Sequence, residues 1–173
     1  MTTPFDTKAH QMGEDADVRQ LRRQVDCFLL SNREDIRAKV LPCLSAIMHC
    51  RLDELGPNDS LVERVGAESI DFIEALFRLE SVFEITIPVG GIKDLSRLGI
   101  EDEFEVDGYL SIRALRRLSI LLPEASGLGP LENLKSHEIQ NLFTSETFVR
   151  LVAWRLSDRK GEAGDSRAKA SDA

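Results

Sequence analysis

Apolar residues recur at intervals of three and four between residues 69 and 83, which is the spacing of one face of an α-helix. The members of this stripe are Ile70, Ile73, Leu76, Phe77, Leu79, Val82 and Phe83. Three acidic residues fall between them and are predicted to face solvent: Asp71, Glu74 and Glu80. Gly66 ends the preceding segment, and Pro88 prevents the pattern from continuing as helix. The pattern therefore predicts a helix from Ser69 to Phe83, about 22 Å long.

Two further helices are predicted upstream. Apolar residues at helical spacing indicate one helix over residues 17–30. Ser31 followed by Glu34 has the spacing of a capping box, so a second helix is expected to start there and to carry an apolar stripe from Ile36 to Met48. Pro42 lies inside this second helix and is expected to kink or split it near Val40.

The segment after Pro88 predicts a mixture of short elements. The pair Asp107-Gly108 between alternating residues indicates a tight hairpin. A helix follows over residues 110–122, and residues 125–130 are predicted to be loop because they hold two glycines and a proline. Thr144 or Ser145 is predicted to cap a last helix. Both ends of the chain are polar, so residues 1–15 are expected to be mobile and residues 157–173 to be a disordered tail.

Composition narrows the classes of function. The 173 residues include 42% hydrophobic and 6% aromatic residues, which suits a small aliphatic helical bundle. The net charge of −8 argues against nucleic-acid binding and for partners with basic surfaces. No apolar run approaches the ~20 residues of a membrane span, and no secretory signal pattern opens the chain. Three cysteines without paired spacing favour a reducing, cytoplasmic setting.

Ser69 is the residue at which chemistry is most strongly indicated. Serine is a favoured N-cap because its hydroxyl accepts a hydrogen bond from a free N–H of the first helical turn, and capping is the more common role on spacing alone. A helix N-terminus is also electropositive, so it stabilises a phosphate attached there. The sequence around Ser69 therefore fits either a cap or the anchor of a phosphodiester-linked group.

The motifs around this serine resemble those of the acyl carrier proteins. That family has Gly-x-Asp-Ser-Leu before an amphipathic helix that ends in Phe-x-Ile-x-Ile-Pro. This chain has Gly66-Ala67-Glu68-Ser69-Ile70 and Phe83-Glu84-Ile85-Thr86-Ile87-Pro88, and residues 55–61 resemble the loop after the family's first helix. Glu68 stands in place of the usual Asp, and Ile70 in place of the usual Leu. The resemblance is strong over about residues 52–88 and poor over the first thirty residues and over residues 89–141.

The resemblance implies a cofactor, partners and roles for several residues. Ser69 would carry covalent 4′-phosphopantetheine from coenzyme A, whose thiol holds acyl groups as thioesters. A phosphopantetheinyl transferase would attach the group, and acyl-loading, ketosynthase or acyltransferase enzymes with basic surfaces would bind the acidic face. The docking residues would be Glu68, Asp71, Glu74 and Glu80, although such charges are most often only solvated surface. The residues expected to form the core, and in the family to line an acyl cavity, are Ile70, Ile73, Leu76, Phe77 and Ile87.

Other candidate sites are weaker. The residue two places after Ser69 is Asp71, so the Gly-x-Ser-x-Gly motif of serine hydrolases is missing and no catalytic residue is assigned. Cys43, His49 and Cys50 match no standard zinc spacing, so no metal site is predicted and Cys43 is expected to pack in the core. Three arginines lie on the helix over residues 110–122, and they form an exposed face, pair with acids of the same protein or bind an anionic partner: Arg113, Arg116 and Arg117.

We therefore expect an all-α, carrier-like helical bundle. Residues 1–32 would form an N-terminal extension with one helix, and residues 33–156 a carrier domain with an insertion over about 89–141. The expected function is a non-enzymatic acyl carrier with phosphopantetheine on Ser69, in a specialised lipid or secondary-metabolite pathway rather than housekeeping fatty-acid synthesis. Two alternatives remain open: a carrier-like interaction module that is never modified, and an α-helical regulator in which Ser69 is only a cap.

Overall fold

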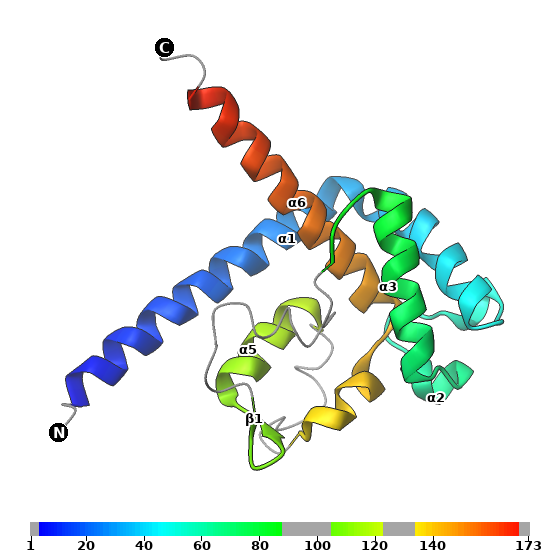
Figure 1. Cartoon of the computed structure of the whole chain (residues 1–173), viewed down its shortest axis with the longest axis horizontal. Helices are drawn as coiled ribbons and strands as arrows, with labels where there is room; N and C mark the ends of the chain where they lie inside the picture. The colour runs from blue at the N-terminus through cyan, green and yellow to red at the C-terminus, as the bar shows by residue number, and fades with distance from the viewer. Residues whose placement is uncertain (1–3, 88–104, 123–133, 170–173) are drawn as a thin grey trace.

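The computed structural model describes residues 4–87, 105–122 and 134–169, and these ranges are mostly helical (Figure 1). The all-α prediction is confirmed. The elements in chain order are α1 (Pro4–Ile47), η1 (Leu52–Glu54), α2 (Leu61–Val65), α3 (Ser69–Phe83), β1 (Glu105–Val106), β2 (Tyr109–Leu110), α5 (Ile112–Leu121), η4 (Ser136–Leu142) and α6 (Ser145–Lys169). Within the described ranges, no helix combines the length and apolar content needed to cross a lipid bilayer.

The helix α1 is one continuous element of 44 residues, although two helices are expected over this stretch. Ser31 does not start a new helix, and Pro42 lies within the helix without ending it. Figure 1 shows the ribbon of α1 changing direction along its length. The Asn32 side-chain amide donates to the Phe28 carbonyl at 2.7 Å, a contact that competes with the helical backbone ladder.

The helix α6 extends further than the sequence predicts. It runs from Ser145 to Lys169, so residues 157–169 are helical rather than a disordered tail. Ser157 is buried, and its hydroxyl accepts a hydrogen bond from the Gln24 amide of α1 at 3.1 Å. Contact with α1 thus accounts for the start of this extension, where the small polar residues offer no apolar stripe.

The hairpin at Asp107-Gly108 is present as predicted. Glu105 pairs with Leu110 and Val106 with Tyr109 in an antiparallel register. Asp107 and Gly108 both have positive φ, at 53° and 85°, which is the requirement of a type I′ turn. Ser111 then caps α5 by accepting a hydrogen bond from the Ala114 N–H at 3.2 Å, and Pro123 and the expected loop over residues 125–130 lie outside the described residues.

The core forms where α1 packs against α6, α3 and α5. Its largest fully buried side chains include Leu44 and Val40 of α1, Leu79 of α3, Ile120 of α5 and Phe148 of α6. An aromatic cluster joins α3 to the last helix: Phe72 lies 5.2 Å from Phe143 and 6.1 Å from Phe148, between ring centroids. Phe72 is in the first turn of α3, so this aromatic cluster packs against the start of that helix.

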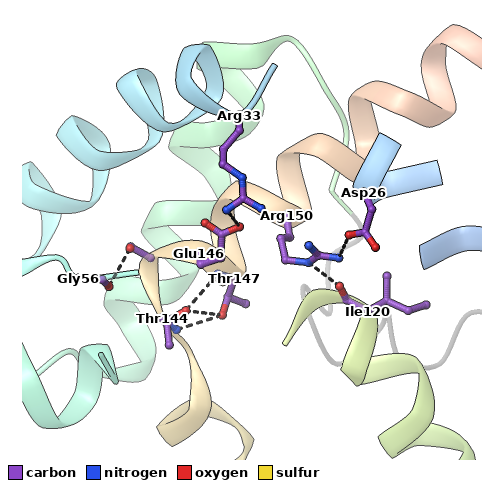
Figure 2. Close-up of polar contacts among 9 residues, drawn as sticks. Asp26, Arg33, Gly56, Ile120, Thr144, Glu146, Thr147 and Arg150 are labelled. Carbon is purple, nitrogen blue, oxygen red and sulfur yellow. Dashed lines mark hydrogen bonds and ion pairs between the residues drawn. The ribbon is translucent and has the colours of Figure 1, made fainter. Parts of the chain in front are cut away.

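Buried polar contacts fix the start of α6 (Figure 2). Thr144 and Thr147 exchange hydrogen bonds between backbone N–H and side-chain hydroxyl, at 3.0 and 3.3 Å, which caps the helix as expected. The Ser145 hydroxyl donates to the Gly56 carbonyl at 3.0 Å. Glu146 is buried and pairs with Arg33 of α1 at 2.8 Å.

Arg150 links three helices (Figure 2). Its side chain is only 5% exposed. Its Nε donates to the Ile120 carbonyl of α5 at 2.7 Å, and its Nη2 donates to the Asp26 carboxylate of α1 at 2.7 Å. The fork geometry of a guanidinium allows one side chain to make both contacts.

Candidate functional site

The start of α3 follows a short, tightly turned connection. Gly66 ends α2 with φ of +70°, a left-handed conformation that favours glycine. Ala67 is buried, and Glu68 is the N-cap residue of α3. The Asp71 carboxylate accepts a hydrogen bond from the Glu68 N–H at 2.7 Å, as the third residue of a capping box does. The Asp71 carboxylate therefore stabilises this helix end.

Ser69 is the first residue of α3 and is exposed. Its hydroxyl does not cap the helix: Glu68 occupies the N-cap position, so the interpretation of Ser69 as a cap is wrong. The hydroxyl instead donates to the side-chain Oε1 of Gln140 in η4, at 2.6 Å. Ser69 is thus an exposed residue at the electropositive end of a helix, and its hydroxyl is hydrogen-bonded to a side chain of η4.

The helix η4 is held against this site by hydrogen bonds to backbone carbonyls at its C-terminal end. The Ser60 hydroxyl donates to the Asn141 carbonyl at 2.7 Å, and the Leu61 N–H donates to the Phe143 carbonyl at 2.9 Å. Phe143 in turn packs edge-on against Phe72. Contacts with α2 and α3 therefore fix the backbone next to Gln140, and this places the Gln140 side chain beside Ser69.

The geometry fits a phosphate ester on Ser69. The oxygen is exposed, and the backbone N–H groups of the first helical turn point toward this end of the helix. The helix α3 has 15 residues over which peptide dipoles add, so its N-terminal end is electropositive. An attached phosphodiester would meet solvent on one side and the helix end on the other.

The four predicted docking acids are not equivalent. Glu68 and Glu74 are exposed, whereas Asp71 and Glu80 are half-buried. Asp71 caps α3, and the Glu80 carboxylate accepts a hydrogen bond from the Ile87 N–H. Asp71 and Glu80 therefore make contacts within the chain, which leaves Glu68 and Glu74 as the more open of the four.

The predicted core residues of α3 are mostly at the surface, and this part of the prediction is wrong. Ile70, Ile73 and Phe77 are 63%, 50% and 66% exposed. Leu76 is half-buried, and Ile87 is buried as expected. The face of α3 that packs inward carries Phe72, Ala75 and Leu79. An apolar strip of Ile70, Ile73 and Phe77, which we call the α3 strip, thus runs down the helix from beside Ser69.

The remaining candidates make no second site among the residues described. No group of three or more His, Cys, Asp or Glu side chains in these ranges has the arrangement of a metal site. Cys43 is buried in the core, as predicted. Arg116 is exposed on α5, while the side chains of Arg113 and Arg117 lie outside the described part of the chain.

Residues 38–99 match the model of the family described as phosphopantetheine attachment site. This segment includes the end of α1, the whole of α2 and α3, and Ser69. This match confirms, over residues 38–99, the resemblance to acyl carrier proteins. A phosphopantetheine attachment site implies a covalently attached 4′-phosphopantetheine group, as predicted. The comparisons with curated proteins and with solved structures returned no match.

Gln140 is the residue of this site that the sequence did not indicate. It lies 71 positions from Ser69, in a stretch with only weak helical periodicity. No motif marks a lone glutamine at that distance, so only the fold could bring the two side chains together.

Proposed function

We propose that this chain is an acyl carrier protein with Ser69 as the attachment residue. The observation that carries the proposal is that Ser69 is exposed at the first position of α3, inside the segment that matches the family model. Its hydroxyl does not cap the helix. When bound, phosphopantetheine supplies a thiol that holds acyl or related intermediates as thioesters. The chain's own residues present that group rather than catalyse a reaction.

The surface beside Ser69 supports docking of enzymes by mixed contacts. The α3 strip offers apolar area, and exposed Glu68 and Glu74 lie at the same end and along the same helix. The proposed partners are a phosphopantetheinyl transferase and acyl-loading, ketosynthase or acyltransferase enzymes with a basic rim around an apolar hollow. The acids would speed encounter, and burial of Ile70, Ile73 and Phe77 would hold the complex.

The proposed pathway is a specialised lipid or secondary-metabolite one in the cytoplasm. The elements between α3 and α6, including the hairpin and α5, add surface beyond the segment that the family model matches. The three cysteines are free thiols, which fits a reducing compartment. Failure of this chain to replace a housekeeping carrier in reconstituted fatty-acid synthesis would support the specialised role, and replacement at comparable rate would contradict it.

Intact-mass measurement tests the attachment residue. The full chain is incubated with coenzyme A and a promiscuous phosphopantetheinyl transferase. We expect the mass to rise by one phosphopantetheine group, and the rise to disappear in Ser69→Ala.

Ser81→Ala is the matched control for this experiment. Ser81 is also an exposed serine of α3, near the other end of the same helix. The control protein should therefore gain the group like the wild type. No gain in the wild-type protein, or a gain that survives Ser69→Ala, would contradict the proposal and favour an unmodified interaction module.

A further inference from the structure

The contact between Ser69 and Gln140 joins the proposed attachment residue to the segment before α6. Ser69 Oγ and Gln140 Oε1 lie 2.6 Å apart, which is a short hydrogen bond between neutral groups. A serine hydroxyl has one proton to donate, and Gln140 receives it. The contact therefore fixes the direction of the O–H bond and, with it, the rotamer of Ser69.

We propose that Gln140 is a positioning residue that holds the Ser69 hydroxyl in one orientation for modification and is released once the ester has formed. This inference rests on the proposed attachment at Ser69. Without Gln140, the hydroxyl loses this hydrogen bond, and the Ser69 side chain is free to change rotamer. The oxygen is then in the orientation that this proposal assigns to modification for only part of the time.

The transfer itself removes the proton on which the contact depends. Ser69 Oγ forms a bond to the phosphorus of the phosphopantetheine phosphate of coenzyme A, and the bond from that phosphorus to the oxygen of 3′,5′-ADP breaks. The hydroxyl proton leaves to a base of the transferase, because the Gln140 amide is too weak a base to accept it. The loaded residue has no O–H, so its Oγ no longer donates to Gln140.

Gln140 lies beside residues that connect this site to α2 and α6. The carbonyl of its neighbour Asn141 accepts a hydrogen bond from the Ser60 hydroxyl, and the Phe143 carbonyl accepts one from the Leu61 N–H. Phe143 leads directly into the capped start of α6. Attachment at Ser69 would thus remove the side-chain link between α3 and η4 while the backbone links from α2 remain.

The test uses Gln140→Met, which keeps the length of the side chain and removes its acceptor. The control is Asn141→Met, because the Asn141 side chain is exposed and its contact with Ser60 is made by the backbone. We expect the initial rate of mass gain at limiting transferase to fall about threefold to tenfold in Gln140→Met, the range that one hydrogen bond supplies, and to be unchanged in the control.

Unfolding of the unmodified and loaded proteins gives a readout that does not depend on activity. In the unmodified form, Gln140→Met should lower the midpoint of thermal unfolding, and its effect should be non-additive with Ser69→Ala. In the loaded form, wild type and Gln140→Met should unfold at the same temperature, because neither has the contact.

The outcomes separate this inference from the proposed function. No mass gain in the wild type overturns both. A normal gain in the wild type, with an unchanged rate in Gln140→Met and additive effects on unfolding, overturns only the assignment of Gln140. Faster modification of Gln140→Met also overturns it, since the contact would then shield the hydroxyl.

Discussion

The three cysteines lie in environments that differ in exposure and charge. Cys27 is exposed on α1, whereas Cys43 is buried in the core. Burial raises the pKa of the Cys43 thiol above its ordinary value, and the positive charge of Arg78 partly opposes this. Burial also raises the pKa of the Cys50 thiol, with a further contribution from the negative charge of Glu54. The thiolate is the reactive form, so these two residues should react slowly.

Alkylation with iodoacetamide at about pH 7.5 should therefore modify Cys27 first, about threefold or more faster than Cys43 and Cys50. Raising the pH toward about 9.5 should speed the reaction of the latter two, because a raised pKa moves thiolate formation to higher pH. Peptide mass spectrometry measures the three rates. In urea all three should react alike, and a folded protein in which Cys43 reacts first would contradict the placement of that residue.

Individual residues of α3 show what periodicity determines and what it leaves open. Ile70, Ile73 and Phe77 have the spacing i, i+3 and i+7. Phe72, Ala75 and Leu79 have the same spacing two residues further along the chain. Both sets fit an apolar helical face, and only the second packs inward. The helix itself was predictable from spacing, but the face it buries depends on α1, which packs against it.

At the scale of elements, the sequence predicted local structures well where a turn or cap determines them. The hairpin follows from Asp107-Gly108, and the start of α6 from Thr144. The continuity of α1 and the length of α6 were not predictable in this way. The continuous part of α1 and the start of the α6 extension lie where these two helices pack together, and contacts such as Gln24 with Ser157 join residues 133 positions apart. Local signals of capping or disorder are overridden there by tertiary contact.

The guanidinium of Arg150 is the clearest test of how these elements are held together. Arg150→Met removes the contacts to Asp26 of α1 and to the Ile120 carbonyl of α5. We expect the free energy of unfolding to fall by about 1–3 kcal/mol, because a buried backbone acceptor loses its donor. The lost ion pair adds little, since the Asp26 side chain is 51% exposed. Urea denaturation monitored by circular dichroism measures the change.

Arg159→Met is the matched control on the same helix. Arg159 is exposed and makes its contact to the Glu84 carbonyl at 2.8 Å near solvent. Its replacement should cost less than about 1 kcal/mol. Equal losses in the two variants would mean that Arg150 does not join the three helices in solution.

The whole molecule combines a strong negative charge with an apolar surface beside Ser69. The net charge is −8, so long-range attraction to a basic partner is expected and should weaken as salt screens it. The contacts of Ile70, Ile73 and Phe77 are short-range and should depend little on salt. Added salt should therefore weaken the contribution of charge to binding and leave the contribution of apolar area nearly unchanged.

Salt dependence separates these two contributions in the reaction with the transferase. Glu74→Lys should raise the KM for the carrier about threefold to tenfold at an ionic strength of about 20 mM, and the effect should shrink toward none near 300 mM. Phe77→Ser should raise the KM at both salt concentrations, because it removes apolar area that the complex buries. Glu34→Lys, an exposed acid on α1, is the control of equal charge change. Equal effects of Glu34→Lys and Glu74→Lys would mean that the partner is attracted by the overall charge and that α3 is not the docking face. An unchanged KM in Phe77→Ser would mean that this partner does not bury the α3 strip.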